Sequence, residues 1–105
     1  TLKDLARSGG SNKTTKQIIR SVAEYFGIET SDIMGQKRTK EIVYPRQVVM
    51  YLLRELLHQS YPQIGDALGG KDHTTIMHGV GKIEKELKHN TATEADIKAI
   101  ISTLN

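Results

Sequence analysis

The chain has 105 residues, the size of one small domain with a modest hydrophobic core. It contains no cysteine, which excludes disulfides and thiolate metal sites and is consistent with a reducing cytoplasm. Fifteen Lys and Arg residues against twelve Asp and Glu residues give a net charge of +3. No apolar run approaches the roughly 18 residues of a membrane-spanning helix and no signal peptide is present, so we predict no membrane segment.

Residues 1–12 are predicted to be the end of a helix followed by a flexible linker. Leu2 and Leu5 share one side of the helical part, and residues 8–12 (SGGSN) have the composition of a linker. The chain opens in mid-helix without a start signal, so we expect it to be the C-terminal piece of a larger protein. Residues 13–105 are predicted to form the folded domain.

The first well-defined helix is predicted to begin at Thr14. Thr14 and Gln17 have the spacing of a capping box, and Gly27 is well placed to end the helix. One apolar stripe runs along it, formed by Ile18, Ile19, Val22, Ala23 and Phe26. This pattern predicts a helix that packs one face against the core.

A very short helix and a basic loop are expected next. Thr30 or Ser31 can cap the short helix, and Gly35 closes it. Residues 36–40 (QKRTK) are polar and basic without periodicity, which predicts a loop. Five basic residues lie from Lys37 to Arg54 against one acid. Such a basic patch favours a polyanionic partner.

A long helix from about Glu41 to His58 is predicted to form the centre of the core. Pro45 is tolerable only in its first turn, where no hydrogen-bond donor is missed. Its broad apolar face consists of Val48, Val49, Leu52, Leu53, Leu56 and Leu57. Arg46, Gln47 and Arg54 fall largely off that face.

The next two helices have the pattern of a helix-turn-helix. Ser60 and Gln63 repeat the capping-box spacing, and the short helix stops at Gly69-Gly70. Asp72 can then cap a helix spanning about 73–88, whose first turn exposes an imidazole and two hydroxyls (His73, Thr74 and Thr75). Such groups suit contact with base edges, and the free N–H groups of a helix start favour a nearby phosphate. Gly79 and Gly81, inside this helix, reflect either close approach of another backbone or of DNA, or tolerated weakness.

A last helix, capped by Thr91 or Thr93, completes the predicted fold. Its apolar stripe is formed by Ile97, Ile100, Ile101 and Leu104. No segment alternates as a half-buried strand does. We therefore predict an all-α fold of about six helices around a helix-turn-helix core, similar to Trp repressor, with a basic loop before the long central helix.

The residues do not indicate an enzyme or a metal site. His73 and His78 are five positions apart and lie on different helix faces, and no HExxH pattern is present. No nucleophile with its base and no paired carboxylates can be recognised, and Gly69-Gly70 lacks the spacing of a phosphate-binding glycine loop.

Three other interpretations of the helical pattern remain open on spacing alone. The first is an ordinary helical hairpin in which Asp72 merely caps and the threonines face water. The second is a helical protein-interaction module without DNA sequence selectivity. The third is RNA binding, which the four tyrosines and single phenylalanine do not favour because stacking aromatics are few.

Residues 60–78 (SYPQIGDALGGKDHTTIMH), followed by Lys82-Ile83, closely resemble the signature of the DnaA family of bacterial chromosomal replication initiators. Residues 22–26 (VAEYF), the Lys37-Arg38 pair and residues 45–47 (PRQ) are similar to the same family, so the resemblance covers about residues 13–104. It implies the C-terminal domain that binds double-stranded DnaA boxes at the replication origin and anchors the initiator there for DNA replication initiation.

The resemblance also sets expectations for the rest of such a protein. Residues 1–7 would end the helix that connects this domain to an AAA+ module, which is absent here. ATP and Mg would belong to that module, and no cofactor is expected in this domain. Other initiator copies would be partners through the AAA+ module, with replication regulators as further partners, in the cytoplasm at the bacterial nucleoid.

Carried over by position, the resemblance assigns the DNA contacts. The expected major-groove contacts are Asp72, His73, Thr74 and Thr75, with Pro62 and Tyr61 at the start of the preceding helix. Arg38 is expected to enter the minor groove at the AT-rich end of the box. The expected phosphate contacts are Lys37, Lys40, Arg46, Gln47, Arg54, Lys71 and Lys82. Tyr61 stands where a leucine is common in the family, and Gly81 stands where a basic residue often precedes Lys82.

Overall fold

The computed structural model describes residues 14–104, and within that range the chain forms six helices and no strand. They are α2 (Thr15–Phe26), α3 (Thr30–Met34), α4 (Lys40–Leu57), α5 (Tyr61–Ala67), α6 (His73–His89) and α7 (Thr91–Leu104). The predicted all-α fold is confirmed. The expected connecting helix and linker at residues 1–12 lie outside the described residues.

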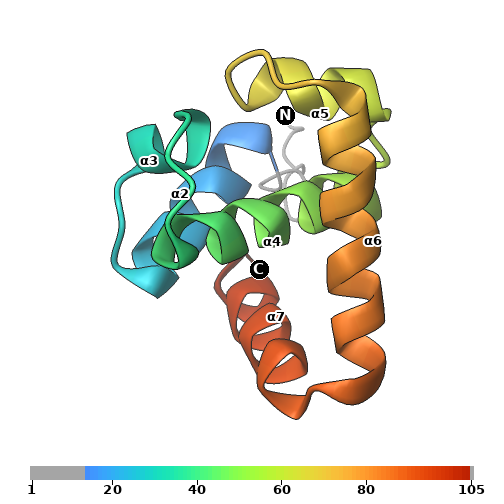
Figure 1. The fold of residues 1–105 in the computed structure, drawn as a ribbon. Coiled ribbons are helices and arrows are strands. Elements are labelled where there is room, and N and C mark those ends of the chain that lie inside the picture. Colours follow the sequence, from blue (N-terminus) through green and yellow to red (C-terminus); the bar gives the residue numbers. More distant parts are fainter. Residues whose placement is uncertain (1–13, 105) are drawn as a thin grey trace, which may run out of the picture.

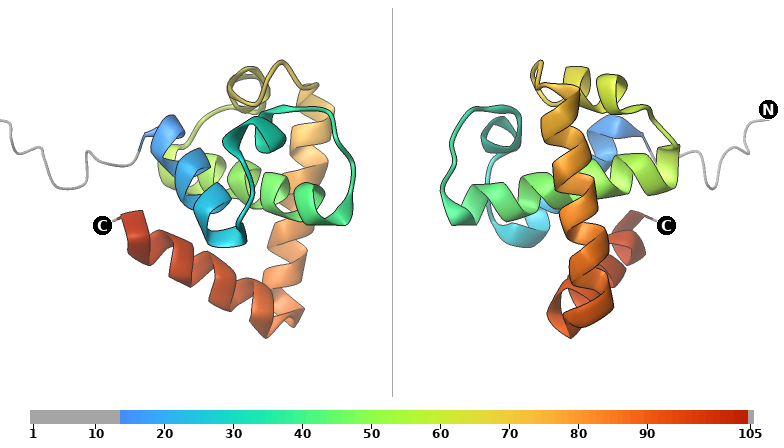
Figure 2. Two further views of the ribbon diagram at one scale, coloured as in Figure 1. Left: turned by 90° about the vertical axis from the view of Figure 1, so that its left-hand side faces the viewer. Right: turned by 45° about the vertical axis from the view of Figure 1, so that its right-hand side comes forward.

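Helix α4 lies at the centre of the molecule (Figure 1). Helix α2 packs against it, and α6 crosses it (Figures 1 and 2). The predicted apolar face of α4 is confirmed, because Val48, Val49, Leu52 and Leu53 are fully buried. Burying each such side chain contributes roughly 1.5–3 kcal/mol, so α4 fixes the positions of the elements around it.

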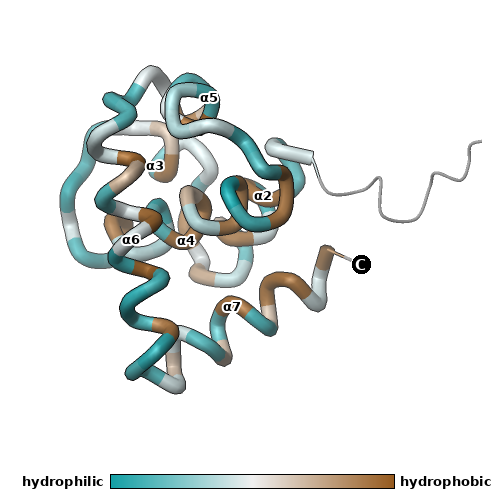
Figure 3. Tube along the Cα trace, turned by 90° about the vertical axis from the view of Figure 1, so that its right-hand side faces the viewer, coloured by the Kyte–Doolittle hydropathy of each residue, from teal (hydrophilic) through white to brown (hydrophobic). Residues whose placement is uncertain are grey.

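The other helices turn apolar faces into the shared core, with α2, α3, α5 and α6 packed against α4 and α7 packed against α2 and α6. The fully buried members are Ile18, Val22, Ile33, Ile64, Leu68, Ile76, Ile83 and Ile100. In Figure 3 hydrophobic stretches alternate with hydrophilic ones along α6 and α7, as expected for helices with one buried face. One face of α6 is therefore committed to the core, and the opposite face is free for other contacts.

The capping residues agree with the sequence at some helix starts and differ at others. The Ser60–Gln63 capping box of α5 is confirmed by reciprocal hydrogen bonds of 3.2 and 2.8 Å. The predicted Thr30 or Ser31 cap of α3 is wrong, because Glu29 takes that position and its backbone N–H donates to Asp32 at 3.3 Å.

The predicted threonine cap of α7 is wrong as well. The side-chain oxygen of Asn90 accepts from the backbone N–H of Ala92 at 2.9 Å and from that of Thr93 at 3.4 Å. Thr93 instead points inward with 2% of its surface exposed. A short Asn side chain placed before the first helical turn can reach two free donors at once.

Helix α4 begins one residue earlier than predicted, at Lys40. The loop that precedes it is therefore residues 35–39, here called the basic loop, and Lys40 belongs to the helix. The expectation that Pro45 lies in the first turn is wrong, since it is a buried residue of the second turn. Its missing N–H leaves the carbonyl of the exposed Glu41 without a helical donor.

Candidate nucleic-acid interface

The first turn of α6 presents its polar side chains to solvent. His73, Thr74 and Thr75 are all exposed, while the next residue, Ile76, is fully buried. The N–H groups at such a helix start have no acceptor inside the helix, and they favour an anion. The turn therefore offers an imidazole, two hydroxyls and free backbone donors on one surface.

Asp72 occupies the cap position of α6 but does not act as a cap. Its side chain accepts no hydrogen bond from the helix start, and the predicted capping role is wrong. The carboxylate lies 3.4 Å from Nδ1 of His73 and is 67% exposed. It is therefore available to accept from an external donor, such as an exocyclic amine of a base.

The turn between α5 and α6 depends on glycine. A Cβ at Gly65 would overlap the backbone carbonyl oxygen of Lys71. The Gly65 carbonyl oxygen in turn accepts from the N–H groups of Gly70 and Lys71, both at 2.9 Å. Gly69 and Gly70 adopt φ angles of 89° and 83°, which favour glycine. This closed turn fixes where α6 begins.

The start of α5 adds an aromatic group that contacts a cation from α4. Pro62 is exposed, and the half-buried ring of Tyr61 lies under the guanidinium of Arg54, whose Cζ is 4.6 Å from the ring centroid. Arg54 also donates to the carbonyl oxygen of Gln59 at 3.0 Å. The ring of Tyr61 thus holds an arginine at the helix start.

The basic loop and the first residue of α4 present their cations to solvent. Arg38 and Lys40 are exposed. The Lys37 side chain is 71% exposed, and its ammonium group lies 3.6 Å from an Asp32 carboxylate oxygen. An exposed ion pair of this kind contributes little to stability and leaves the lysine able to bind another anion.

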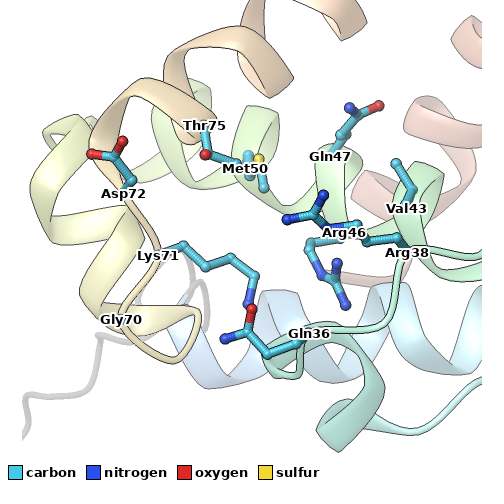
Figure 4. A pocket seen from close by; sticks show the side chains of 10 residues that line it. All are labelled: Gln36, Arg38, Val43, Arg46, Gln47, Met50, Gly70, Lys71, Asp72 and Thr75. Carbon is cyan, nitrogen blue, oxygen red and sulfur yellow. The ribbon is translucent and has the colours of Figure 1, made fainter.

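A hollow of about 430 Å³ separates the basic loop from the start of α6 (Figure 4). Arg38 and Gln36 line one side, Thr75 and Asp72 line the other, and α4 forms the floor. The floor residues are Val43, Arg46, Gln47 and Met50. Of the residues expected to contact the two grooves, the hollow brings together Arg38, Asp72 and Thr75; His73, Thr74, Pro62 and Tyr61 do not line it.

Arg46 does not lie off the apolar face, and that expectation is wrong. The side chain is 7% exposed and donates to the carbonyl oxygens of Ile33, Lys37 and Asp32 at 2.8, 2.7 and 2.7 Å. Burial lowers the pKa of its guanidinium from the ordinary value. Three of its five N–H groups are engaged by backbone, so this arginine holds the end of α3 and the basic loop, and the phosphate contact expected of it stays a prediction.

The ammonium group of Lys71 is likewise engaged by backbone carbonyl oxygens. Its ammonium nitrogen lies 3.3, 2.6 and 2.9 Å from the carbonyl oxygens of Met34, Gly35 and Leu68. Burial, and then the nearby Arg46 charge, lowers the pKa of Lys71. An ammonium group has three donors, and all three are satisfied by backbone here.

The outer face of α6 continues the exposed basic surface away from the tip. Lys82 is exposed as expected, together with three residues that the sequence did not assign to a DNA contact, His78, Lys85 and His89. Their spacings of four, three and four would have revealed one stripe. Gly79 is buried, and a Cβ there would overlap the Met50 side chain, whereas a Cβ at Gly81 would meet no atom within 4 Å.

The glycine-rich turn between α5 and α6 does not fit a nucleotide phosphate. Gly69 packs against the end of α3, and the ammonium group of Lys71, which follows Gly69-Gly70, is bound to carbonyl oxygens. The turn is therefore no phosphate-binding loop. Between residues 14 and 104, no three His, Asp or Glu side chains lie close enough together to hold a metal ion. In the same range no helix is long and apolar enough to cross a bilayer.

The sequence pattern of the family described as "Bacterial dnaA protein helix-turn-helix" matches residues 15–83. The chain belongs to this family. The matched residues run from α2 to the middle of α6 and include the basic loop, the turn and the start of α6.

Relatives named "Chromosomal replication initiator protein DnaA" match almost the whole chain. The one from Limosilactobacillus reuteri is 46% identical over 98% of this chain, and the one from Lactococcus lactis subsp. cremoris is 46% identical over 95%. The chain spans 23% and 22% of those proteins. A crystal structure described as a DNA replication initiation factor matches with a TM-score of 0.75 and 27% identity, over 95% of this chain and 32% of that one.

Proposed function

We propose that this domain binds double-stranded DnaA boxes at the replication origin and anchors an initiator there for chromosomal replication. One observation carries the proposal: the exposed tip of α6 and the exposed basic loop flank one hollow of about 430 Å³. A helix tip suits the major groove, and an arginine on a loop suits the adjacent minor groove.

The chemistry of the tip matches base edges. Asp72 would accept from cytosine N4, and the methyl groups of Thr74 and Thr75 would contact thymine methyls. His73 would donate to an adenine or a backbone oxygen. Pro62 and Tyr61, at the start of α5, would pack against the same strand. These contacts would supply most of the discrimination between sequences.

Arg38 would enter the minor groove at the AT-rich end, where the narrow groove concentrates negative potential. Arg46 and Lys71 are left out of the proposed phosphate contacts because their donors bind backbone carbonyl oxygens. The proposed phosphate contacts are then Lys37, Lys40, Gln47, Arg54 and Lys82. They would supply most of the affinity. Because two grooves are used together, one copy of the domain can bind an asymmetric site.

The wider roles rest on the resemblance to whole initiators, of which this chain spans about a quarter. Binding, without a chemical step, is the activity proposed for these residues. ATP and Mg would act in an AAA+ module, through which initiator copies would also assemble. The domain would work on chromosomal DNA in the bacterial nucleoid, where replication regulators are further candidate partners.

Fluorescence anisotropy with a DnaA-box duplex and a scrambled duplex at physiological salt tests the proposal. We expect the box to bind about 10³-fold more tightly or better. With four cations on phosphates, log K against log salt should have a slope of about −4. Equal affinity for the two duplexes would contradict the proposal, and a flat salt response would favour a protein-interaction module.

Arg38→Ala tests the minor-groove assignment separately. The loss of affinity should be largest on boxes with an intact AT-rich end and smaller where G·C pairs replace that end. Lys40→Ala, which removes a neighbouring charge, should lower the affinity equally for the box with an intact AT-rich end and for the box in which G·C pairs replace it. Unchanged affinity of Arg38→Ala for the AT-rich box would remove the assignment.

A further inference from the structure

Two inward-facing cations hold the end of the same short helix. Arg46 of α4 binds the carbonyl oxygens of Asp32 and Ile33 in α3, and also that of Lys37 in the basic loop. Lys71, from the turn before α6, binds the next two carbonyl oxygens, those of Met34 and Gly35. Between them they engage four successive carbonyls where α3 ends and the basic loop begins.

The backbone itself is in contact at the same place. Gly69 of the turn lies so close to α3 that a Cβ there would overlap the Met34 carbonyl oxygen. The last carbonyls of a helix lack intrahelical donors and need partners from elsewhere. Here the partners come from the turn on one side and from α4 on the other, and Figure 4 shows Lys71 reaching across the hollow toward the Gln36 side.

We propose that Arg46 and Lys71 form a clasp that positions the basic loop relative to the tip of α6, so that both grooves are engaged at once. Neither residue needs to touch DNA for this, and the inference rests on the proposed function. The loop holds Arg38, and the turn leads directly into Asp72 and His73. A fixed separation between the two elements avoids the ordering cost that a loose loop would pay on binding.

The first test measures this separation without DNA. The chain has no cysteine, so Arg38→Cys and Met77→Cys can be labelled uniquely with spin labels. Both positions are exposed and lie outside the clasp. Pulsed electron–electron double resonance should give one narrow population of distances between the two labels in the unaltered background. In Lys71→Met the distance distribution should be at least about twice as broad.

Three further variants make the distance measurement decisive. Lys71→Arg keeps donors within reach and should restore the narrow population. Lys82→Met removes an equal charge from α6 outside the clasp and should leave it unchanged. Lys71→Gln is the milder substitution to use if circular dichroism shows that Lys71→Met unfolds. A narrow distribution in a folded Lys71→Met or Lys71→Gln chain would overturn the proposal.

The second test measures coupling between the two grooves on a DnaA-box duplex. Arg38→Ala and Thr75→Ala, alone and together, form a double-mutant cycle. We expect the combined loss to differ about 3- to 10-fold from the product of the single losses in the unaltered background. In the Lys71→Met background the affinity loss of the double variant should equal the product of the two single losses to within twofold.

The outcomes separate the possible failures. If Lys71 is a phosphate contact, Lys71→Met should weaken box and scrambled DNA alike, lower the salt slope by about 1 and leave the coupling intact; that result would overturn the clasp. If the unaltered chain does not prefer the box, the proposed function fails, while the distance measurement still decides whether the clasp positions the loop.

Discussion

Two sets of basic residues surround the proposed interface, and they differ in what their donors contact. Lys37, Arg38 and Lys82 are exposed and project into solvent. Arg46 and Lys71 are drawn inward, with their donors on backbone carbonyl oxygens. The difference comes from α3, which is only five residues long and ends in carbonyls that need donors. Cations within reach of such an end become structural, and the others remain free for an anionic partner.

The largest effect should come from breaking the inward set. Arg46→Met removes three hydrogen bonds to buried or half-buried carbonyl oxygens and leaves these acceptors unsatisfied. We expect a loss of about 3 kcal/mol in the free energy of unfolding. Urea titration followed by circular dichroism measures it.

Arg38→Met is the matched control from the outward set. Its side chain is exposed, so the free energy of unfolding should change by less than about 0.5 kcal/mol. Equal losses in the two variants would mean that the inward and outward cations do not differ in the way the structure shows.

Substitutions at the exposed tip of α6 should lower DNA affinity without changing the stability of the fold. Thr75→Ala or His73→Ala should cost about 1–3 kcal/mol of binding free energy on a cognate box, because a groove contact is lost. Stability should barely change, since both side chains are exposed. Titrations with box and scrambled duplexes check this, and equal losses on both would refute a base-reading role.

Two helical glycines, the buried Gly65 and the exposed Gly81, allow the same comparison of an inward with an outward position, without a change of charge. Gly65→Ala should destabilise the domain by about 1–3 kcal/mol, because the added Cβ overlaps the Lys71 carbonyl oxygen. Gly81→Ala should stabilise it by up to about 1 kcal/mol, because the position is helical and open. Thermal unfolding of both variants measures the difference. If Gly81→Ala weakens DNA binding while stabilising the fold, close approach of DNA explains that glycine.

The apolar periodicities of α2, α4, α6 and α7 were enough to predict the fold, because each buried face recurs at helical spacing. The exposed tip residues could also be predicted, since they follow a turn and precede a buried Ile76. The inward turn of Arg46 and Lys71 could not. It depends on where the last carbonyls of α3 come to lie in space, and no local pattern around either residue encodes that. The cap of α7 is different, because it is local: Asn90 accepts from the N–H groups two and three residues on, and Asn is a preferred capping residue that the sequence shows.

The smallest predicted effect lies on the far side of α4, where α2 and α7 meet. The hydroxyls of Tyr25 and Tyr44 both donate to Asp96, at 2.7 and 3.0 Å. Burial is the main cause that raises the pKa of Tyr44, whose hydroxyl also lies 3.2 Å from that of Thr93. Because folding raises the pKa of Tyr44, its neutral hydroxyl contributes fully to the stability of the fold below about pH 10, the ordinary tyrosine value. This contribution is lost as pH rises through the folded-state pKa.

Tyr44→Phe should therefore lose stability less steeply than the unaltered chain above about pH 10. Comparing the two chains at each pH cancels the opposite contribution of Lys71, whose pKa is lowered. Urea midpoints from pH 8 to pH 11 check this, and parallel curves would show that Tyr44 does not contribute.

Binding to a DnaA box in which uracil replaces thymine tests most directly whether the tip of α6 reads base edges. Uracil lacks only the C5 methyl group in the major groove, and minor-groove and phosphate contacts are preserved. We predict that the unaltered chain binds the uracil box more weakly, by about 1 kcal/mol or more, and that Thr75→Ala shows a much smaller loss. Equal affinity of the unaltered chain for both boxes, or an equal loss in Thr75→Ala, would contradict the account.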